Sequence, residues 1–284
     1  MAESKSLVEG ARKVVNIDDF EVKALWVRQR LWEMTMKLGR GHLASCYSYV
    51  DILVALYYGG ILRYDAEKPT DHNRDRIIIS KGHATAALYP IFADIGYFDL
   101  KELEHYGEPD ALLGVFANTK IPGIEAVSDS LGHGLGIGTG MALAAKLNGD
   151  DYRVFVILGD AECNEGSVWE SVAFAGHHIL DNLVVIVDDN HLGILGAPIG
   201  LQGFNERWRA CGWHCEPTGG HSFTSLLNAF NFISATDMDK PFVIVANTVK
   251  GKGVSFMEGK AEWHNKIPNE EQQKQGRLDL GLPT

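Results

Sequence analysis

The chain is poor in cysteine and in positive charge, and each scarcity excludes a class of protein. Its 284 residues contain four cysteines and no C-x-x-C pair, which is too few for the disulfide framework of a small secreted domain. The formal net charge is −11 at pH 7, and no run of lysine and arginine occurs. Because binding to nucleic acid requires clustered cations, a nucleic-acid partner is disfavoured.

Long hydrophobic runs are also missing. The N-terminal segment "MAESKSLVEGARK" lacks the apolar centre of a signal peptide, and no stretch reaches the length that spans a bilayer. We therefore expect a cytoplasmic protein without a membrane attachment. The hydrophobic content of 45% is nevertheless sufficient for a sizeable core.

Two common nucleotide-binding signatures are absent as well. No G-x-x-x-x-G-K-[ST] loop occurs. The glycine-rich segment "GHGLGIGTG" (132–140) follows polar residues instead of a strand, and no acidic residue stands at the distance required for a ribose. A mononucleotide or dinucleotide site is thus disfavoured.

Short apolar runs rich in β-branched residues are typical of strands buried on both faces of a parallel sheet. They are "RIIIS" (76–80), "RVFVILGD" (153–160), "NLVVIVDDN" (182–190) and "PFVIVANTV" (241–249).

Apolar residues at helical spacing lie before, between and after these runs. They predict helices over 18–38, 48–62, from Ala84 onward, 135–147, 167–180, 206–213 and 221–235. The alternation predicts an α/β fold, with a mostly parallel sheet sandwiched by helices, in one domain over residues 1–284. Residues 265–284 form a polar C-terminal tail, for which we expect a short helix with little to bury.

Acidic residues gather at the predicted end of one strand, in "LGDAECNEGSVWE" (158–170). Asp160 ends this strand, and 188–190 (Asp-Asp-Asn) ends the next. Ligands of parallel sheets bind at these carboxyl ends, and carboxylate, amide and main-chain oxygens are the donors that Mg²⁺ prefers near a diphosphate. The alternative is a turn and a helix cap, since Ser167 and Glu170 match a capping box.

Several segments resemble a known family. Gly159-Asp160-Ala161, followed after one helix by Asn190, resembles the thiamine diphosphate motif, usually G-D-G with a later asparagine. Further segments resemble those of transketolases, in order. They are "RDRIIISKGHATAALY" (74–89), "SDSLGHGLGIGTGMALAAKL" (128–147), "LDNLVVIVDDN" (180–190), "WRACGWH" (208–214) and "TVKGKGVSFMEGKAEWH" (248–264). The chain is identified as a member of this family, similar to the N-terminal, diphosphate-binding subunit of the split two-chain kind.

The resemblance implies thiamine diphosphate held through Mg²⁺ or Ca²⁺. The metal ligands it implies are Asp160, the Asn190 side chain and the Leu192 carbonyl. The other cofactor-binding positions it implies are Leu131 and Gly132 along the rings, Gly159 and Ala161 beside the metal aspartate, and Glu165 near a contact between subunits.

The resemblance also implies a role for three histidines. His42 in "GRGH", His83 in "SKGH" and His264 in "EWH" match positions that bind the diphosphate or the substrate and move protons. Each alone would more often be a structural histidine. The implied reaction is transfer of a two-carbon ketol unit from a ketose, for which groups that titrate near neutrality are suited.

The implied enzyme requires a partner. No candidate for the glutamate that activates the cofactor is present, so we expect a C-terminal subunit with the pyrimidine-binding domain, in an α₂β₂ assembly. The donor is a sugar phosphate or related ketose, and the acceptor is an aldose phosphate or, alternatively, a lipoyl or carrier-protein thioester. Two other interpretations stay open: the α subunit of a 2-oxo acid dehydrogenase, and a non-catalytic cofactor-binding scaffold.

The chain departs from the family pattern at several positions. In "GHLASCYS", Cys46 and Tyr47 are expected to add bulk beside the catalytic cleft. Ala161 replaces the glycine that is usual after the metal aspartate. Alanine is tolerated at this position only if the backbone φ is negative. Glu108 in "GEP" occupies the position expected for a histidine that contacts the donor, and Glu162 has no assigned role.

Overall fold

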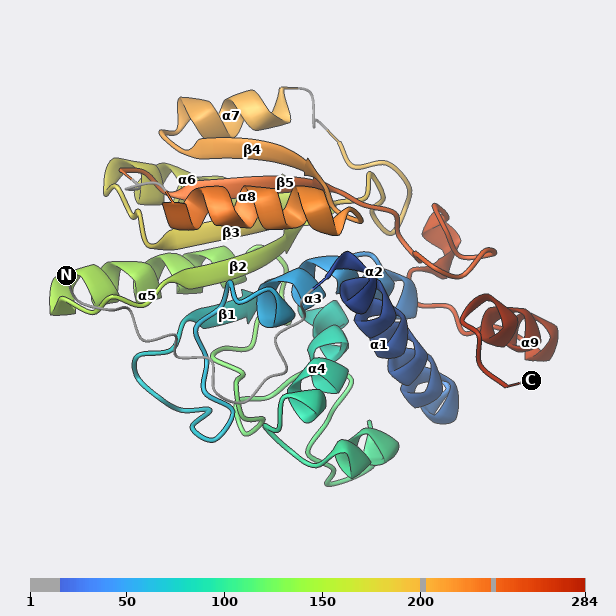
Figure 1. Ribbon diagram of the computed structural model, residues 1–284. Coiled ribbons are helices and arrows are strands. Elements are labelled where there is room, and N and C mark those ends of the chain that lie inside the picture. Colours follow the sequence, from blue (N-terminus) through green and yellow to red (C-terminus); the bar gives the residue numbers. More distant parts are fainter. Residues whose placement is uncertain (1–15, 200–202, 236–238, 284) are drawn as a thin grey trace.

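A parallel sheet forms the centre of the protein in a computed structural model, which describes residues 16–199, 203–235 and 239–283 (Figure 1). Its strands lie in the order β1-β2-β3-β5-β4, and all neighbours are parallel. They are β1 (Arg76–Ile79), β2 (Val154–Gly159), β3 (Leu183–Asp189), β4 (His214–Gly219) and β5 (Phe242–Asn247). The predicted α/β fold and the predicted parallel sheet are confirmed.

Successive residues of β1, β2, β3 and β5 point alternately into two different cores. In β2, Phe155 and Ile157 belong to one hydrophobic cluster, whereas Val154 and Val156 belong to the other. This alternation follows from the twofold period of a strand. Burial on both faces explains why the strands are continuous apolar runs.

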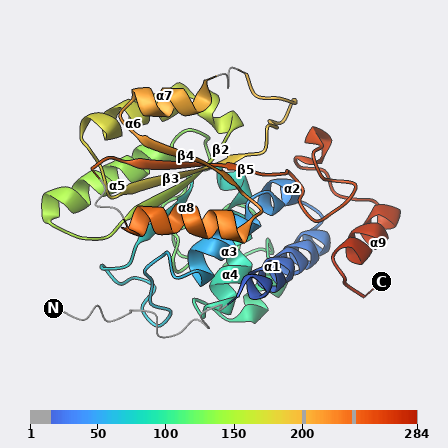
Figure 2. The same cartoon turned by 45° about the horizontal axis from the view of Figure 1, so that its top comes forward.

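Helices cover both faces of the sheet, as Figures 1 and 2 show. One face is covered by α1 (Ile17–Leu38), α2 (Leu43–Tyr47), α3 (Val50–Tyr58), α4 (Leu88–Asp94) and α8 (Phe223–Ala235). The other is covered by α5 (Gly134–Asn148), α6 (Gly166–His177) and α7 (Phe204–Ala210). Short 3₁₀ helices are η1 (Gly82–Ala87), η2 (Leu100–His105), η3 (Ala161–Asn164) and η4 (Ala261–Trp263). Among the described residues, no helix is both long and apolar enough to cross a membrane.

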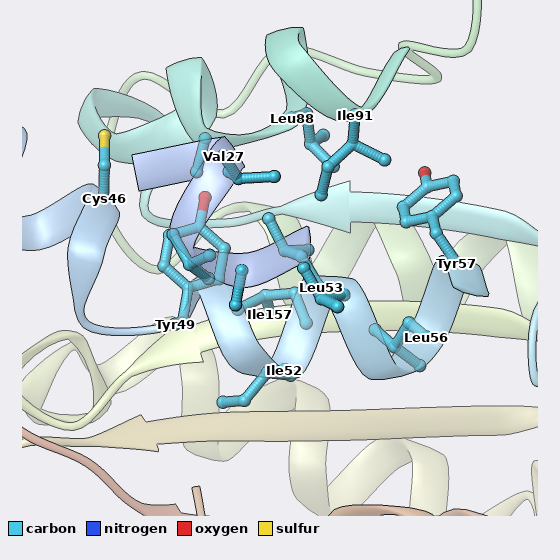
Figure 3. Close-up of a cluster of buried hydrophobic side chains, with 14 of the residues drawn as sticks. Val27, Cys46, Tyr49, Ile52, Leu53, Leu56, Tyr57, Leu88, Ile91 and Ile157 are labelled. Carbon is cyan, nitrogen blue, oxygen red and sulfur yellow. The ribbon is translucent and has the colours of Figure 1, made fainter. Parts of the chain in front are cut away.

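Cys46 of "GHLASCYS" lies in the hydrophobic core beside α3 (Figure 3). The Cys46 thiol points to the Ala84 carbonyl at 3.4 Å, and the Tyr47 hydroxyl donates to the Arg28 carbonyl at 2.7 Å. Both side chains are buried among the helices. The bulk that was expected beside the cleft is therefore packed into the hydrophobic core, where both residues belong to one cluster.

One strand and several helix ends differ from the sequence prediction, and α6 (Gly166–His177) and α7 (Phe204–Ala210) each end three residues earlier than predicted. β4 was not predicted, because Pro217 interrupts a short segment without an apolar run. Proline is tolerated here because β4 is an edge strand. The helix predicted over 48–62 is shorter, since α3 ends at Tyr58 before Gly59 and Gly60.

The capping box predicted for the helix after β2 is wrong. α6 begins at Gly166, so Ser167 lies inside the first turn, and no side chain caps this end. The Ser167 hydroxyl instead donates to the Gly132 carbonyl at 2.9 Å. The Ser167 hydroxyl therefore bonds to the loop before α5, which is distant in sequence, and does not cap its own helix.

The C-terminal segment contains the expected short helix, α9 (Glu270–Asp279), which begins with a capping box of Asn269 and Gln272. Most of the segment is exposed or half-buried, as expected, but Leu280 and Leu282 after the helix are buried in the core. In both views α9 lies beyond α1, and Gln29 of α1 donates to the Leu280 carbonyl at 2.8 Å. The segment is polar because it contacts the core with few residues.

Candidate active site

The carboxyl ends of β1, β2, β3 and β5 meet at one edge of the sheet, where a cavity of about 410 Å³ opens. Most residues predicted for the site line this cavity. They are His83, Leu131, Gly159, Asp160, Ala161, Asn190, Leu192 and His264. The rule that parallel sheets bind ligands at this edge therefore placed the cavity correctly.

Three predicted residues lie outside the cavity wall. Gly132 lies directly behind Leu131, and His42 contacts the histidines of the wall. Glu165 is exposed where α6 begins. Their predicted roles in cofactor binding, catalysis and contact between subunits therefore stay predictions.

Asp160 has the properties of a cation ligand. Its Oδ1 accepts a hydrogen bond from the Ala161 amide at 2.8 Å, whereas its Oδ2 is buried with no hydrogen-bond partner among the described residues. Burial raises the pKa of Asp160 to about 6, and the nearby carboxylates of Asp188 and Asp189 act in the same direction. A divalent cation would satisfy this oxygen and offset the repulsion.

The loop after β3 brings further ligand groups to Asp160. The Asn190 side chain accepts from the Leu192 amide at 3.1 Å through Oδ1, and its Nδ2 donates to Ser48 at 2.9 Å. Ligand atoms of Asp160, Asp189 and His191 lie within 4.8 Å of one another. His191 was expected to be structural, so its position in this group is a finding of the structure.

A buried ion pair forms the floor of the cavity. Lys81, which follows β1, pairs with Asp188 of β3, and the exposed fractions of the two side chains are 4% and 0%. Asp188 also accepts from the hydroxyls of Ser48, at 2.7 Å, and Thr248. One carboxylate therefore connects β1, β3, the segment after α2 and the segment after β5.

The predicted catalytic histidines form one cluster. Ring centroids are 4.9 Å apart for His42 and His83, 5.2 Å for His42 and His264, and 5.1 Å for His83 and His264. Burial, followed by the charge of Lys81, lowers the pKa of His83 to about 2. Burial and Lys250 lower the pKa of His264 to about 4. Near pH 7 these imidazoles are therefore neutral, and each ring offers one N–H donor and one acceptor nitrogen.

Lys250 completes the cluster. Its Nζ lies 2.9 Å from Nδ1 of His264, and burial followed by Lys81 lowers the pKa of Lys250 to about 8. Because an ammonium group can only donate, His264 accepts at Nδ1 and carries its proton on Nε2. The lysine thereby determines the tautomer of the histidine.

A second cavity, of about 590 Å³, lies on the other side of His42, and Arg40, Glu108 and Phe116 line it. Glu108 pairs with Lys37 at 3.2 Å and with His105 at 2.9 Å, and hydrogen bonds from His105 and Lys37 lower the pKa of Glu108. Its charge is thus already paired on the protein. Phe116 is the aromatic side chain on this cavity wall, and its ring centroid lies 6.4 Å from that of His42.

Ala161 is accommodated without backbone strain. It is the first residue of η3 and is not among the residues with positive φ. Because a negative φ suits any L-residue, the glycine usual at this position is not required.

Sequence reasoning missed four groups of the site. Lys81 and Lys250 lie in "SKGH" and "KGKG", the segments that carried the resemblance, but had no role assigned. Glu162 and Asp188 stand beside the predicted metal ligands, and only burial and contacts distinguish them from solvent-exposed acids. The available signal was Lys81, a lysine directly after the apolar run of β1, where a charged side chain needs a buried partner.

Known proteins share this architecture. The profile of the family described as "Transketolase, thiamine diphosphate binding domain" matches residues 24–284. One of the subunits of the apulose-4-phosphate transketolase of Phocaeicola vulgatus is 37% identical over 261 residues, which cover 91% of this chain and 92% of that protein. The 6-deoxy-6-sulfo-D-fructose transketolase subunit SqwG of a Clostridium species is 35% identical, with 92% and 96% covered.

A solved structure agrees. Transketolase from Campylobacter jejuni superimposes with a TM-score of 0.87 at 28% identity, and the match covers 94% of this chain and 43% of that one. The chain thus spans less than half the length of this transketolase. The resemblance inferred from the motifs is confirmed: the chain belongs to the transketolase family of transferases, where it corresponds to the thiamine diphosphate binding domain.

Proposed function

We propose that the chain binds thiamine diphosphate through a divalent cation and, with a partner subunit, transfers a two-carbon ketol unit from a ketose to an acceptor. The observation that carries the proposal is a single cavity that is lined both by a candidate cation ligand and by basic groups. Among the described residues, Oδ2 of Asp160 has no hydrogen-bond partner, and His83, His264 and Lys250 line the same cavity.

The residues at the sheet edge fit the cofactor. Asp160, the Asn190 side chain and the Leu192 carbonyl would hold Mg²⁺ or Ca²⁺, with Asp189 and His191 within reach of Asp160. Lys250 and the two histidines of the wall would face the diphosphate as donors. When bound, thiamine diphosphate supplies the nucleophilic carbon that carries the two-carbon unit.

The histidine cluster suits proton transfer at the substrate. The neutral imidazole of His83 offers one nitrogen as a hydrogen-bond acceptor for a substrate hydroxyl, whereas His264, whose Nδ1 accepts from Lys250, can donate from Nε2. His42 contacts both of these rings and also lines the second cavity. We therefore place the ketose in the second cavity, with its reacting end at His42.

A sugar phosphate or a related anionic ketose is the substrate class that we favour. The names of two relatives specify apulose 4-phosphate and 6-deoxy-6-sulfo-D-fructose, and Arg40 on the wall of the second cavity is a cation that could face such an anionic end. An aldose phosphate is the corresponding acceptor. The carrier-protein thioester stays a prediction.

A C-terminal subunit would complete the enzyme. Both relatives are named as subunits, and nearly their whole length is covered by this chain. We therefore propose a partner with the pyrimidine-binding domain, in an α₂β₂ assembly, with the cofactor and the exposed Glu165 between the chains. The cytoplasmic location stays a prediction of the sequence.

Calorimetry and turnover test the proposal. The full chain, mixed with its C-terminal partner, should bind thiamine diphosphate with Mg²⁺ and cleave a ketose phosphate or hydroxypyruvate, whereas an Asp160→Ala variant should lose the metal-dependent binding. Decarboxylation of simple 2-oxo acids would instead indicate the dehydrogenase function. Absence of cofactor binding in the complex would indicate a scaffold.

A further inference from the structure

Glu162 is a buried carboxylate in the loop after β2, and its exposed fraction is 2%. Its Oε1 accepts from the Ser80 hydroxyl, at the end of β1, and from the Gly132 amide at 2.8 Å. Its Oε2 accepts from the Gly159 amide, at the end of β2, at 3.0 Å. One side chain thus connects two strand ends to the loop before α5.

The Gly132 loop is held at both the amide and the carbonyl of one residue. Glu162 accepts from its amide, and the Ser167 hydroxyl donates to its carbonyl at 2.9 Å. Gly132 has a φ of +82°, and an added Cβ would lie 2.6 Å from Oγ of Ser167. The loop therefore has little room to move, and it presents Leu131 to the cavity.

Ser80 extends the same network. Its hydroxyl oxygen accepts a hydrogen bond from the Gly134 amide at 3.1 Å, and the same hydroxyl donates a hydrogen bond to Glu162. The first amide of α5 is thereby fixed to the end of β1. All three donors reach Glu162 without a proton on the carboxylate, so the ionised form fits the geometry.

We propose that Glu162 is a positioning residue for the cofactor, which sets the Leu131–Gly132 loop relative to Asp160 and so determines cofactor affinity. This inference rests on the proposed function. Glu162 connects the two parts directly, because Gly159 immediately precedes Asp160.

Glu162→Gln distinguishes a carboxylate from a space-filling side chain. Glutamine has the same shape, but its NH₂ group would face the amide of Gly159 or of Gly132, and two donors cannot pair. Glu206→Gln is the matched control, because Glu206 of α7 is exposed and pairs with Arg209 on the same helix.

Amide hydrogen exchange of the full chain, without cofactor, is the first measurement. In Glu162→Gln we expect exchange at Gly132 or Gly159 to rise about tenfold or more, with α8 and α9 unchanged. Calorimetry on the complex with the partner is the second, and the affinity for thiamine diphosphate with Mg²⁺ should fall about tenfold or more, with a much smaller change in kcat. Glu206→Gln should change neither quantity.

Unchanged exchange at both glycines, or unchanged cofactor affinity in a complex whose wild type binds the cofactor, would overturn the inference. If Glu162→Gln does not fold, Ser167→Ala removes the other hold on Gly132, and the same two changes are expected at smaller size. A wild-type complex that binds no thiamine diphosphate refutes the proposed function, and hydrogen exchange still decides whether Glu162 holds the loop.

Discussion

Replacing Lys81 by methionine should destabilise the protein strongly. Lys81→Met keeps the length of the side chain but removes the only cation paired with Asp188 among the described residues. Asp188 is fully buried, and its remaining donors are the hydroxyls of Ser48 and Thr248 and the side-chain amide of Asn190. A buried charge without a counter-ion is the expected result.

The magnitude follows from this burial. Removing one partner of a buried ion pair costs about 3–5 kcal/mol. The retained hydroxyl bonds place the expected loss at the lower end, about 3 kcal/mol. At about 2–4 °C for each kcal/mol in larger domains, the Tm should fall by about 6–12 °C.

Thermal and urea unfolding of the full chain without cofactor measure this change. The double variant Lys81→Met with Asp188→Asn should recover most of the loss, because asparagine still accepts from the hydroxyls but carries no charge. The matched control is Lys146→Met, whose pair with Asp181 is exposed at 37% and 36% and should change stability by less than about 1 kcal/mol.

Either of two outcomes would refute the reasoning: a Tm of Lys81→Met equal to that of Lys146→Met, or strictly additive losses in the double variant.

The remaining predictions concern the cavity wall. Gly132→Ala should lower the free energy of unfolding by about 2–4 kcal/mol and weaken cofactor binding in calorimetry, because Gly132 has a φ of +82° and an added Cβ would lie 2.6 Å from Oγ of Ser167. Gly140→Ala is the control: an added Cβ there has nothing within 4 Å, so this variant should be neutral or stabilising. Ala161→Gly should leave cofactor affinity within about threefold, since η3 is unstrained, and a marked tightening would contradict this. Lys250→Met should raise the Tm of the chain at pH 7. The pKa of Lys250 is about 8 in the folded chain, compared with 10.5 for an unperturbed lysine, so its buried charge destabilises the fold fully below pH 8. This destabilisation is relieved as the pH rises from 8 to 10.5. The Tm advantage of Lys250→Met in melting curves should therefore vanish near pH 10.5.

Local patterns carried most of the fold and the position of the site. Strands such as β2 and β3 are continuous apolar runs because both of their faces are buried, and this is visible without any structure. Asp160 and Asn190 end neighbouring parallel strands, so they had to meet at one edge. The three histidines were chosen through the resemblance, since spacing along the chain says nothing about residues that far apart.

Contacts between distant segments decided the rest. Cys46 and Tyr47 were expected to add bulk beside the cleft, and the packing of α2 against α1 and η1 directs both side chains into the core. Ser167 was expected to cap α6, but its hydroxyl donates a hydrogen bond to the Gly132 carbonyl instead. The edge position that permits Pro217 in β4 is likewise a property of the sheet order.

The sequence by itself determined that this protein has a helix-covered parallel sheet and a carboxylate and an amide at neighbouring strand ends, because periodicity and strand polarity act locally. Only the tertiary structure decided which buried groups support the cavity. Lys81 with Asp188, and Glu162 with Gly132, join residues far apart in the chain. Whether an acid is a solvated surface group or a buried, fully paired one depends on what surrounds it, and long-range packing alone supplies those surroundings.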